Sequence, residues 1–184
     1  MDSPTTPSTP TTSTTAASIT PEPLPQPTDA QIASIIARLR ANQNFAGAIA
    51  GGLVGAIIGA VLWAIITVIT KFEIGWEAVG VGFLVGFLSR KLGRGIDPLY
   101  GYLGGFLSAI GIALGNILTV MMVVSSDQHI PFLDLLGRLN PSITWMWLTA
   151  NFSPIDILFY GIGIYYGYRN AFHRITPREI AALR

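Results

Sequence analysis

Long apolar stretches alternate with short polar segments along this chain, and the pattern predicts helices that cross a membrane. The first stretch, residues 45–70, carries no charged side chain. At about 1.5 Å per residue, a helix of this length exceeds the ~30 Å hydrocarbon core of a bilayer. Three more candidate spans follow at residues 74–89, 99–126 and 153–168. We therefore expect an all-α membrane protein with a bundle of four transmembrane helices over residues 45–168.

Small residues recur at every fourth position within the first three spans, as one row in each of the first two spans and as two separate rows in the third. Each row lies on one face of its helix. Helices in a bilayer associate through close packing, and small side chains let a second backbone approach. The spacing therefore predicts glycine-zipper packing, and the first and second spans are expected to pack on each other. The residues concerned are Gly47, Gly51, Gly55 and Gly59, then Ala78, Gly82 and Gly86, and then Gly101, Gly105, Gly111 and Gly115. Gly52 is rotated about 100° from Gly51, so we expect it to face lipid or a looser contact.

The topology of the second span is open between a full crossing and a re-entrant segment. Only residues 78–89 lack charge, which is short of the ~20 residues that a crossing needs unless flanking Lys and Arg side chains reach the interface. The distribution of Lys and Arg favours the crossing. Four crossings place nine of the eleven on one face, whereas the re-entrant arrangement places eight there. We therefore expect both termini in the cytoplasm.

Two segments precede the first span. Residues 1–27 are mostly Thr, Ser, Pro and Ala, which cannot bury enough apolar surface to fold, so they predict a disordered tail. Residues 28–44 begin with Thr28 and Gln31, the spacing of a capping box, and continue as an amphipathic helix. This helix either lies on the membrane surface or extends the first span into the cytoplasm.

Residues 127–151 predict an interfacial helix followed by a loop, with Trp145 and Trp147 suited to the headgroup zone. The apolar face of that helix consists of Phe132, Leu135, Leu136 and Leu139. Residues 169–184 predict a basic cytoplasmic tail with another short helix that starts at Thr176.

Composition agrees with a membrane protein and argues against enzyme chemistry. The chain is 51% hydrophobic and 11% charged, against the ~25% charged residues usual in soluble domains. It has no cysteine, which excludes disulfides and thiolate metal sites. His129 and His173 fall in segments expected on opposite faces of the membrane, and no nucleotide-binding or nucleophile motif is present. We expect no metal, cofactor or nucleic acid and no enzyme activity, and the sequence identifies no small-molecule substrate.

Three polar residues within the spans are candidates for chemistry. An ionisable group in a membrane segment is costly and often marks an ion path, so Glu77 is the first, although a carboxylate one turn into a short helix also fits the interface. Asn116 can bond to another helix or line a polar path. Asp156 follows Ser153 and Pro154, so it fits a helix cap better than a transport role.

The glycine-rich run from Gly75 to Gly86, after a zipper span that contains Trp63, resembles a group of small uncharacterised multi-pass bacterial membrane proteins. The resemblance implies a protein of the bacterial inner membrane without an assigned activity. Our first hypothesis is a structural or accessory subunit that packs against itself or another membrane protein through its glycine faces. The alternative is a small oligomeric channel or transporter with Glu77 or Asn116 on the conducting path.

Overall fold

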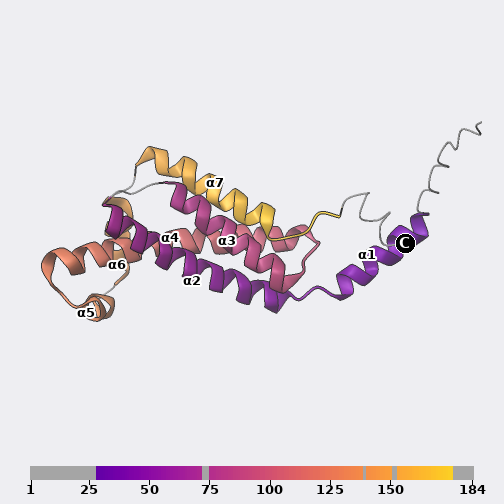
Figure 1. Cartoon of the computed structure of the whole chain (residues 1–184), viewed down its shortest axis with the longest axis horizontal. Helices are drawn as coiled ribbons and strands as arrows, with labels where there is room; N and C mark the ends of the chain where they lie inside the picture. The colour runs from indigo at the N-terminus through magenta and orange to yellow at the C-terminus, as the bar shows by residue number, and fades with distance from the viewer. Residues whose placement is uncertain (1–27, 72–74, 139, 151–152, 176–184) are drawn as a thin grey trace, which may run out of the picture.

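The computed structural model describes residues 28–71, 75–138, 140–150 and 153–175, and every regular element in them is a helix (Figure 1). The expected all-α class is therefore confirmed. Four helices form an elongated bundle: α2 (Phe45–Thr70), α3 (Trp76–Gly93), α4 (Pro98–Gln128) and α7 (Pro154–Asn170). Both α2 and α7 contact α3 and α4. Helix α1 (Asp29–Ala41) projects from one end of the bundle, and α5 (Phe132–Gly137) and α6 (Pro141–Ala150) lie at the other (Figure 1).

Among the described residues, α2 and α4 are the helices long and apolar enough to cross a membrane. Helix α3 has 18 residues and includes Glu77, Arg90 and Lys91, and α7 has 17 residues. At 1.5 Å per residue these two helices are about 27 and 25 Å long, slightly shorter than a bilayer core. Length and composition thus support membrane insertion most directly for α2 and α4.

The helix boundaries follow the charge-free stretches closely for α2, whereas α3 continues into the basic residues that follow its charge-free stretch. Helix α2 coincides with the expected span. Helix α3 does not stop at Ser89 but continues through Arg90 and Lys91 to Gly93. Arg and Lys are good helix formers, and cations are favourable near a helix C-terminus, so both can extend the last turn. Residues 90–93, which follow the expected end of the second span, are therefore helical as well.

Polar contacts set the helix ends. The backbone N–H of Gln31 donates to Thr28 Oγ1 (3.4 Å) and the N–H of Thr28 donates to Gln31 Oε1 (3.1 Å), so the predicted capping box at α1 is confirmed. Helices α2, α3 and α4 end at residues in the left-handed conformation, Lys71 (φ 60°), Arg94 (φ 50°) and His129 (φ 55°). That conformation costs a non-glycine residue roughly 1–2 kcal/mol.

Small residues on α2 form two adjacent rows: the first faces α3, and the second approaches α4 except at its N-terminal end, where Ala48 contacts Gly93 of α3. A Cβ atom at Gly55 would lie 2.8 Å from the Cα of Val85 on α3. Gly52 is also buried, and a Cβ there would collide with Leu107 of α4 and lie 2.6 Å from Ser89 Oγ. Gly52 therefore does not face lipid, and of the two expected alternatives it has the looser contact, because its neighbours are side chains whereas those of Gly51 and Gly55 are backbone atoms. Side chains at consecutive helix positions point about 100° apart. Because α2 packs against both α3 and α4, both positions are buried.

The second row continues along α2 toward its C-terminal end. Its members Ala48, Gly52, Ala56, Ala60 and Ala64 are all buried. A Cβ at Gly111 of α4 would lie 3.1 Å from the Cα of Ala56. Close approach to α4 thus depends on alanines as well as glycines.

The segment between α4 and α7 is more helical than expected. The predicted interfacial helix is α5, which ends at Gly137 and buries Leu135. The following stretch was expected to be a loop, but it forms α6, which starts at Pro141, a residue favoured in the first turn of a helix. The predicted disordered tail at 1–27, the predicted helix from Thr176, Leu139 and the side chain of Trp147 lie outside the described residues.

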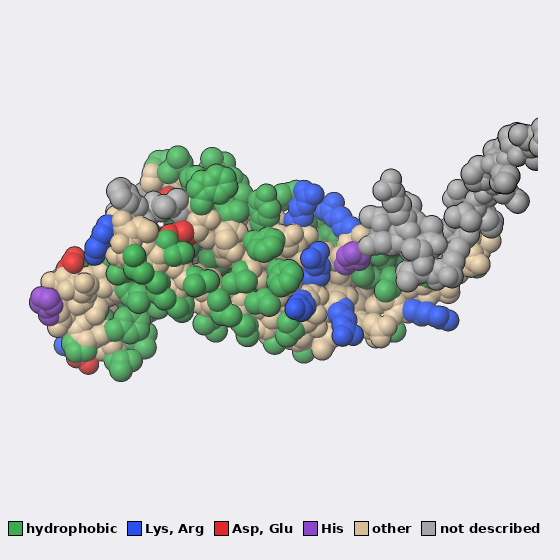
Figure 2. Space-filling model, viewed as in Figure 1, with side chains coloured by type: hydrophobic (Ala, Val, Ile, Leu, Met, Phe, Trp, Pro, Cys, Tyr) green, Lys and Arg blue, Asp and Glu red, His purple; other side chains and the backbone are tan. Residues whose placement is uncertain are grey.

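Apolar side chains cover the visible middle of the bundle, whereas charged side chains gather at its two ends (Figure 2). Nine branched apolar residues of α2 point outward with exposed fractions of 39–75%. They are Leu53, Val54, Ile57, Ile58, Val61, Leu62, Ile65, Ile66 and Ile69. Most of the Lys and Arg side chains in this view lie at the end near α1, and the acidic ones lie at the opposite end (Figure 2).

Candidate functional site

The small residues predicted on α3 face α7 rather than α2. A Cβ at Gly86 would lie 2.8 Å from the carbonyl oxygen of Gly167, and one at Gly82 would collide with the carbonyl of Gly163. Ala78 is fully buried, and its carbonyl carbon would lie 2.9 Å from a Cβ at Gly163. The expectation that this row packs on the first span is therefore wrong. The surface of α3 that meets α2 is formed by larger residues, including Val81, Val85 and Leu88.

The remaining predicted packing residues also lie inside the chain. In α2, a Cβ at Gly47 would lie 2.6 Å from the Leu92 carbonyl oxygen, that at Gly51 would collide with the Leu88 carbonyl, and that at Gly59 would lie 3.2 Å from the Cα of Val81. In α4, Gly101 and Gly105 approach the C-terminal part of α7 and the segment after it, and Gly115 approaches the Trp63 ring at 3.0 Å. These faces are thus occupied by other helices of the same chain.

Glu77 is half-buried in the first turn of α3, beside the last turns of α2. Thr67 Oγ1 donates a hydrogen bond of 2.9 Å to Glu77 Oε2. Thr67 is three residues from the end of α2, so the pair lies roughly 5 Å from that end and not at the centre of the bundle. This position agrees with an interfacial carboxylate held by a buried hydroxyl.

A cavity of about 530 Å³ lies next to this pair, between the C-terminal parts of α2 and α4. Its polar lining residues are Thr67 and Lys71 from α2 and Thr119 and Asp127 from α4. Three valines of α4 supply apolar wall: Val120, Val123 and Val124. Thr119 is 3% exposed, and its Oγ1 has no hydrogen-bond partner among the described residues. The cavity therefore extends from the charged residues Lys71 and Asp127 at the helix ends to the unpaired hydroxyl of Thr119, which lies about 12 Å from Asp127 along α4.

Asn116 bonds across the bundle. Its Nδ2 donates to the hydroxyl of Tyr160 on α7 (2.9 Å) and to the carbonyl oxygen of Ile112 (3.1 Å). A second cavity of about 400 Å³ borders this pair and is mostly apolar, with Trp145 of α6 as part of its wall. The amide thus joins α4 to α7, one of the two roles considered for it.

Asp156 caps its own helix. Its carboxylate accepts a hydrogen bond of 2.8 Å from the backbone N–H of Ser153, one turn earlier. A carboxylate in the first turn of a helix is also favourable with the helix dipole. Glu77, Asn116 and Asp156 therefore each have a local partner, and the structure does not gather them into one catalytic group.

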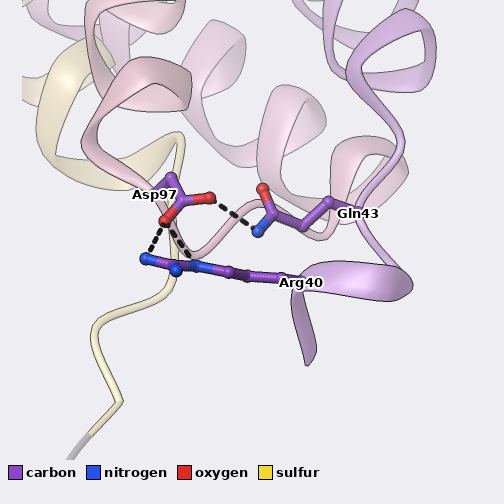
Figure 3. Close-up of polar contacts among 3 residues, drawn as sticks. All are labelled: Arg40, Gln43 and Asp97. Atoms are coloured by element: carbon purple, nitrogen blue, oxygen red, sulfur yellow. Dashed lines mark hydrogen bonds and ion pairs between the residues drawn. The ribbon is translucent and has the colours of Figure 1, made fainter. Parts of the chain in front are cut away.

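A polar contact that the sequence pattern did not indicate lies at the basic end of the bundle (Figure 3). The carboxylate of Asp97, just before α4, accepts hydrogen bonds from Arg40 Nε (3.2 Å) and Gln43 Nε2 (2.9 Å), and Arg40 Nη2 lies 3.1 Å from it. The contact ties the α1–α2 connection to the α3–α4 turn. Since the Arg40 side chain is 62% exposed, its ion pair is worth only about 0.2–1 kcal/mol.

Metal chemistry has no support in the described part of the chain, where no group of three or more His, Cys, Asp or Glu residues could hold an ion. No protein-family model, curated protein or solved structure matches the chain. The resemblance to small bacterial membrane proteins therefore stays a prediction.

The sequence identified the polar residues Glu77 and Asn116 as candidates but not the hydroxyl groups near them. Thr67, Thr119 and Tyr160 contact or neighbour the predicted polar residues, but each lies on a different helix or a distant turn. A hydroxyl within an apolar span is the available signal, because such groups need a partner in lipid. That signal alone does not show which helix supplies the partner.

Proposed function

We propose that this chain is a multi-pass protein of the bacterial inner membrane, in which α2, α3, α4 and α7 all cross and both termini are cytoplasmic. The observation that carries the proposal is the division of α2 into an inner surface of small residues and an outer surface of nine exposed branched apolar residues. An apolar surface of that extent is unfavourable in water and suits contact with lipid.

The shorter helices α3 and α7 fit the same arrangement. Glycines let α3 approach α7 closely, in the manner of glycine-zipper helices. Basic residues at one end, including Arg90, Lys91 and Arg169, can extend their side chains to the interface and offset a length of about 25–27 Å. Lys and Arg at one end of the bundle also support the cytoplasmic location of that end.

The topology is directly testable because the chain contains no native cysteine. Single cysteines at Asn42, Arg94, Gly137 and His173 can be labelled in intact cells with a membrane-impermeant maleimide, and again after lysis. Four crossings require Asn42, Arg94 and His173 to be protected in intact cells and Gly137 to be labelled. If Asn42 and Arg94 lie on opposite sides, α3 is re-entrant and the four-crossing arrangement is refuted.

Within the membrane, we propose a structural or accessory role through contact with a second copy or another membrane protein. The glycine faces are occupied within the chain, so such a contact uses the outward branched surface of α2 instead. Co-purification in mild detergent, followed by mass spectrometry and sizing, tests this role. A strictly monomeric protein that retains no partner at any detergent concentration would contradict it.

A small channel or transporter is the second candidate, and the observation that favours it is the cavity lined by Thr67, which is the hydrogen-bond partner of Glu77. Reconstitution into liposomes with ion-flux measurement separates the two roles. A flux that Glu77→Gln abolishes supports transport and refutes a purely structural role, whereas absence of flux from folded protein refutes transport.

A further inference from the structure

The cavity between the C-terminal parts of α2 and α4 contains a hydroxyl that the protein leaves unsatisfied. The other buried hydroxyls among the described residues each have an acceptor: Ser108 bonds to the carbonyl of Gly104 (2.7 Å), Ser89 to that of Ala48 (3.0 Å), and Thr67 to the Glu77 carboxylate (2.9 Å). Thr119 Oγ1 is buried and has no such partner among the described residues. Because buried polar groups are nearly always hydrogen-bonded, an unpartnered hydroxyl that lines a cavity indicates a ligand there.

Two opposite charges, Lys71 and Asp127, also line this cavity, and neither forms an ion pair with another described residue. Asp127 lies in the last turn of α4, where the negative end of the helix dipole disfavours a carboxylate. Lys71 is the C-cap of α2, and its side chain is exposed without an anionic partner among the described residues. An external cation beside Asp127 would offset the unfavourable placement of that carboxylate, and an external anion could pair with Lys71.

We propose that this cavity binds a zwitterionic phospholipid with a primary ammonium headgroup, such as phosphatidylethanolamine. The phosphate contacts Lys71, the ammonium contacts Asp127, and an ester carbonyl accepts the hydrogen bond of Thr119, while an acyl chain lies along the valines of α4. The inference rests on the proposed location in a membrane. Charge complementarity selects this lipid class, because an anionic headgroup would meet Asp127 without a cation of its own, and a quaternary ammonium cannot donate hydrogen bonds to the carboxylate.

The test uses the full chain, delipidated in mild detergent and titrated separately with dioctanoyl phosphatidylethanolamine, phosphatidylglycerol and phosphatidylcholine. Native mass spectrometry measures the fraction of protein carrying one lipid. The wild type should prefer phosphatidylethanolamine by about tenfold, the ratio expected for a charge-assisted hydrogen bond. Asp127→Asn should remove most of that preference. Thr119→Val should weaken binding about fivefold without changing the preference.

Lys71→Gln should weaken binding of all three lipids, since all contain the phosphate. Arg94→Gln is the matched control, because Arg94 also ends a helix in the left-handed conformation but lies at the opposite end of the bundle. It should leave phosphatidylethanolamine binding unchanged. Asp127 is exposed, so Asp127→Asn should fold even if Thr119→Val does not.

An unchanged headgroup preference in folded Asp127→Asn would overturn the proposal, as would equal binding of the three lipids by the wild type. Alkaline carbonate extraction of membranes provides the separate check on location. Extraction of the chain into the soluble fraction would refute both proposals, whereas a membrane-retained chain without the preference refutes the lipid site alone.

Discussion

Glycines that differ in their surroundings give a graded test of the packing around α2. Replacing Gly51 by Ala places a methyl group against the backbone carbonyl of Leu88, which can move only if α3 moves. Overpacking of this kind costs roughly 1–3 kcal/mol. Ala is also a better helix residue than Gly by about 0.5–1 kcal/mol, which offsets part of the cost. The expected net change for Gly51→Ala is a loss of up to about 2.5 kcal/mol in the free energy of unfolding.

Gly80→Ala is the matched control, because a Cβ at that position would meet nothing within 4 Å. It should raise the free energy of unfolding by up to about 1 kcal/mol. The difference between the two variants therefore isolates the overpacking cost. Gly55→Ala should resemble Gly51→Ala, since its Cβ would also meet the backbone of α3.

Gly52→Ala should fall between these limits. Its Cβ would meet the end of the Leu107 side chain, which can rotate, and Ser89 Oγ, whose hydrogen bond of 3.0 Å to the Ala48 carbonyl would be strained. The assay is unfolding of the purified protein by sodium dodecyl sulfate in mixed micelles, followed by far-ultraviolet circular dichroism, with oligomeric state read on a sizing column. Equal stability of the Gly51, Gly52 and Gly80 variants would refute the packing of α2 against α3 and α4.

Three further predictions concern single contacts and the N-terminal segment. In a double-mutant cycle, Asn116→Leu and Tyr160→Phe should show a coupling of about 0.6 kcal/mol in the same unfolding assay, and zero coupling would mean that the hydrogen bond does not persist in micelles. Ser89→Ala should lower the free energy of unfolding by about 1 kcal/mol through loss of the bond to Ala48, with Ser126→Ala, an exposed serine of α4, as the control. Deletion of residues 1–27 should leave the yield of membrane-inserted protein unchanged, because that segment is too polar to contribute to a core, and loss of insertion would show otherwise.

The hydropathy pattern predicted where the helices lie in the sequence better than the residue spacing predicted which helices pack together. Residues 45–70 form one helix with the expected ends because the stretch lacks charges and proline. The partner of each small-residue row was harder to assign. Spacing places Ala78, Gly82 and Gly86 on one face, but it does not specify whether α2 or α7 lies against that face.

The cavity could not be predicted from local patterns. It forms where the C-terminal part of α4, which extends to Gln128, adjoins the end of α2 near Lys71. Its polar residues on α2 are separated from those on α4 by more than forty positions in the sequence. By contrast, Asp156 as a helix cap followed from three residues within four positions, Ser153, Pro154 and Asp156, because capping is a local interaction.

The two buried rows on α2 restrict how this helix can change in length during evolution. One inserted residue rotates everything beyond it by about 100°, which would turn one row toward lipid and bring branched residues such as Ile57 and Ile58 against α3 or α4. An insertion of four residues rotates the helix by about 400°, only ~40° from its starting direction, so it largely restores both rows. Homologues of this chain should therefore vary the length of α2 in steps of three or four residues, whereas the segment between α4 and α7 should accept single insertions.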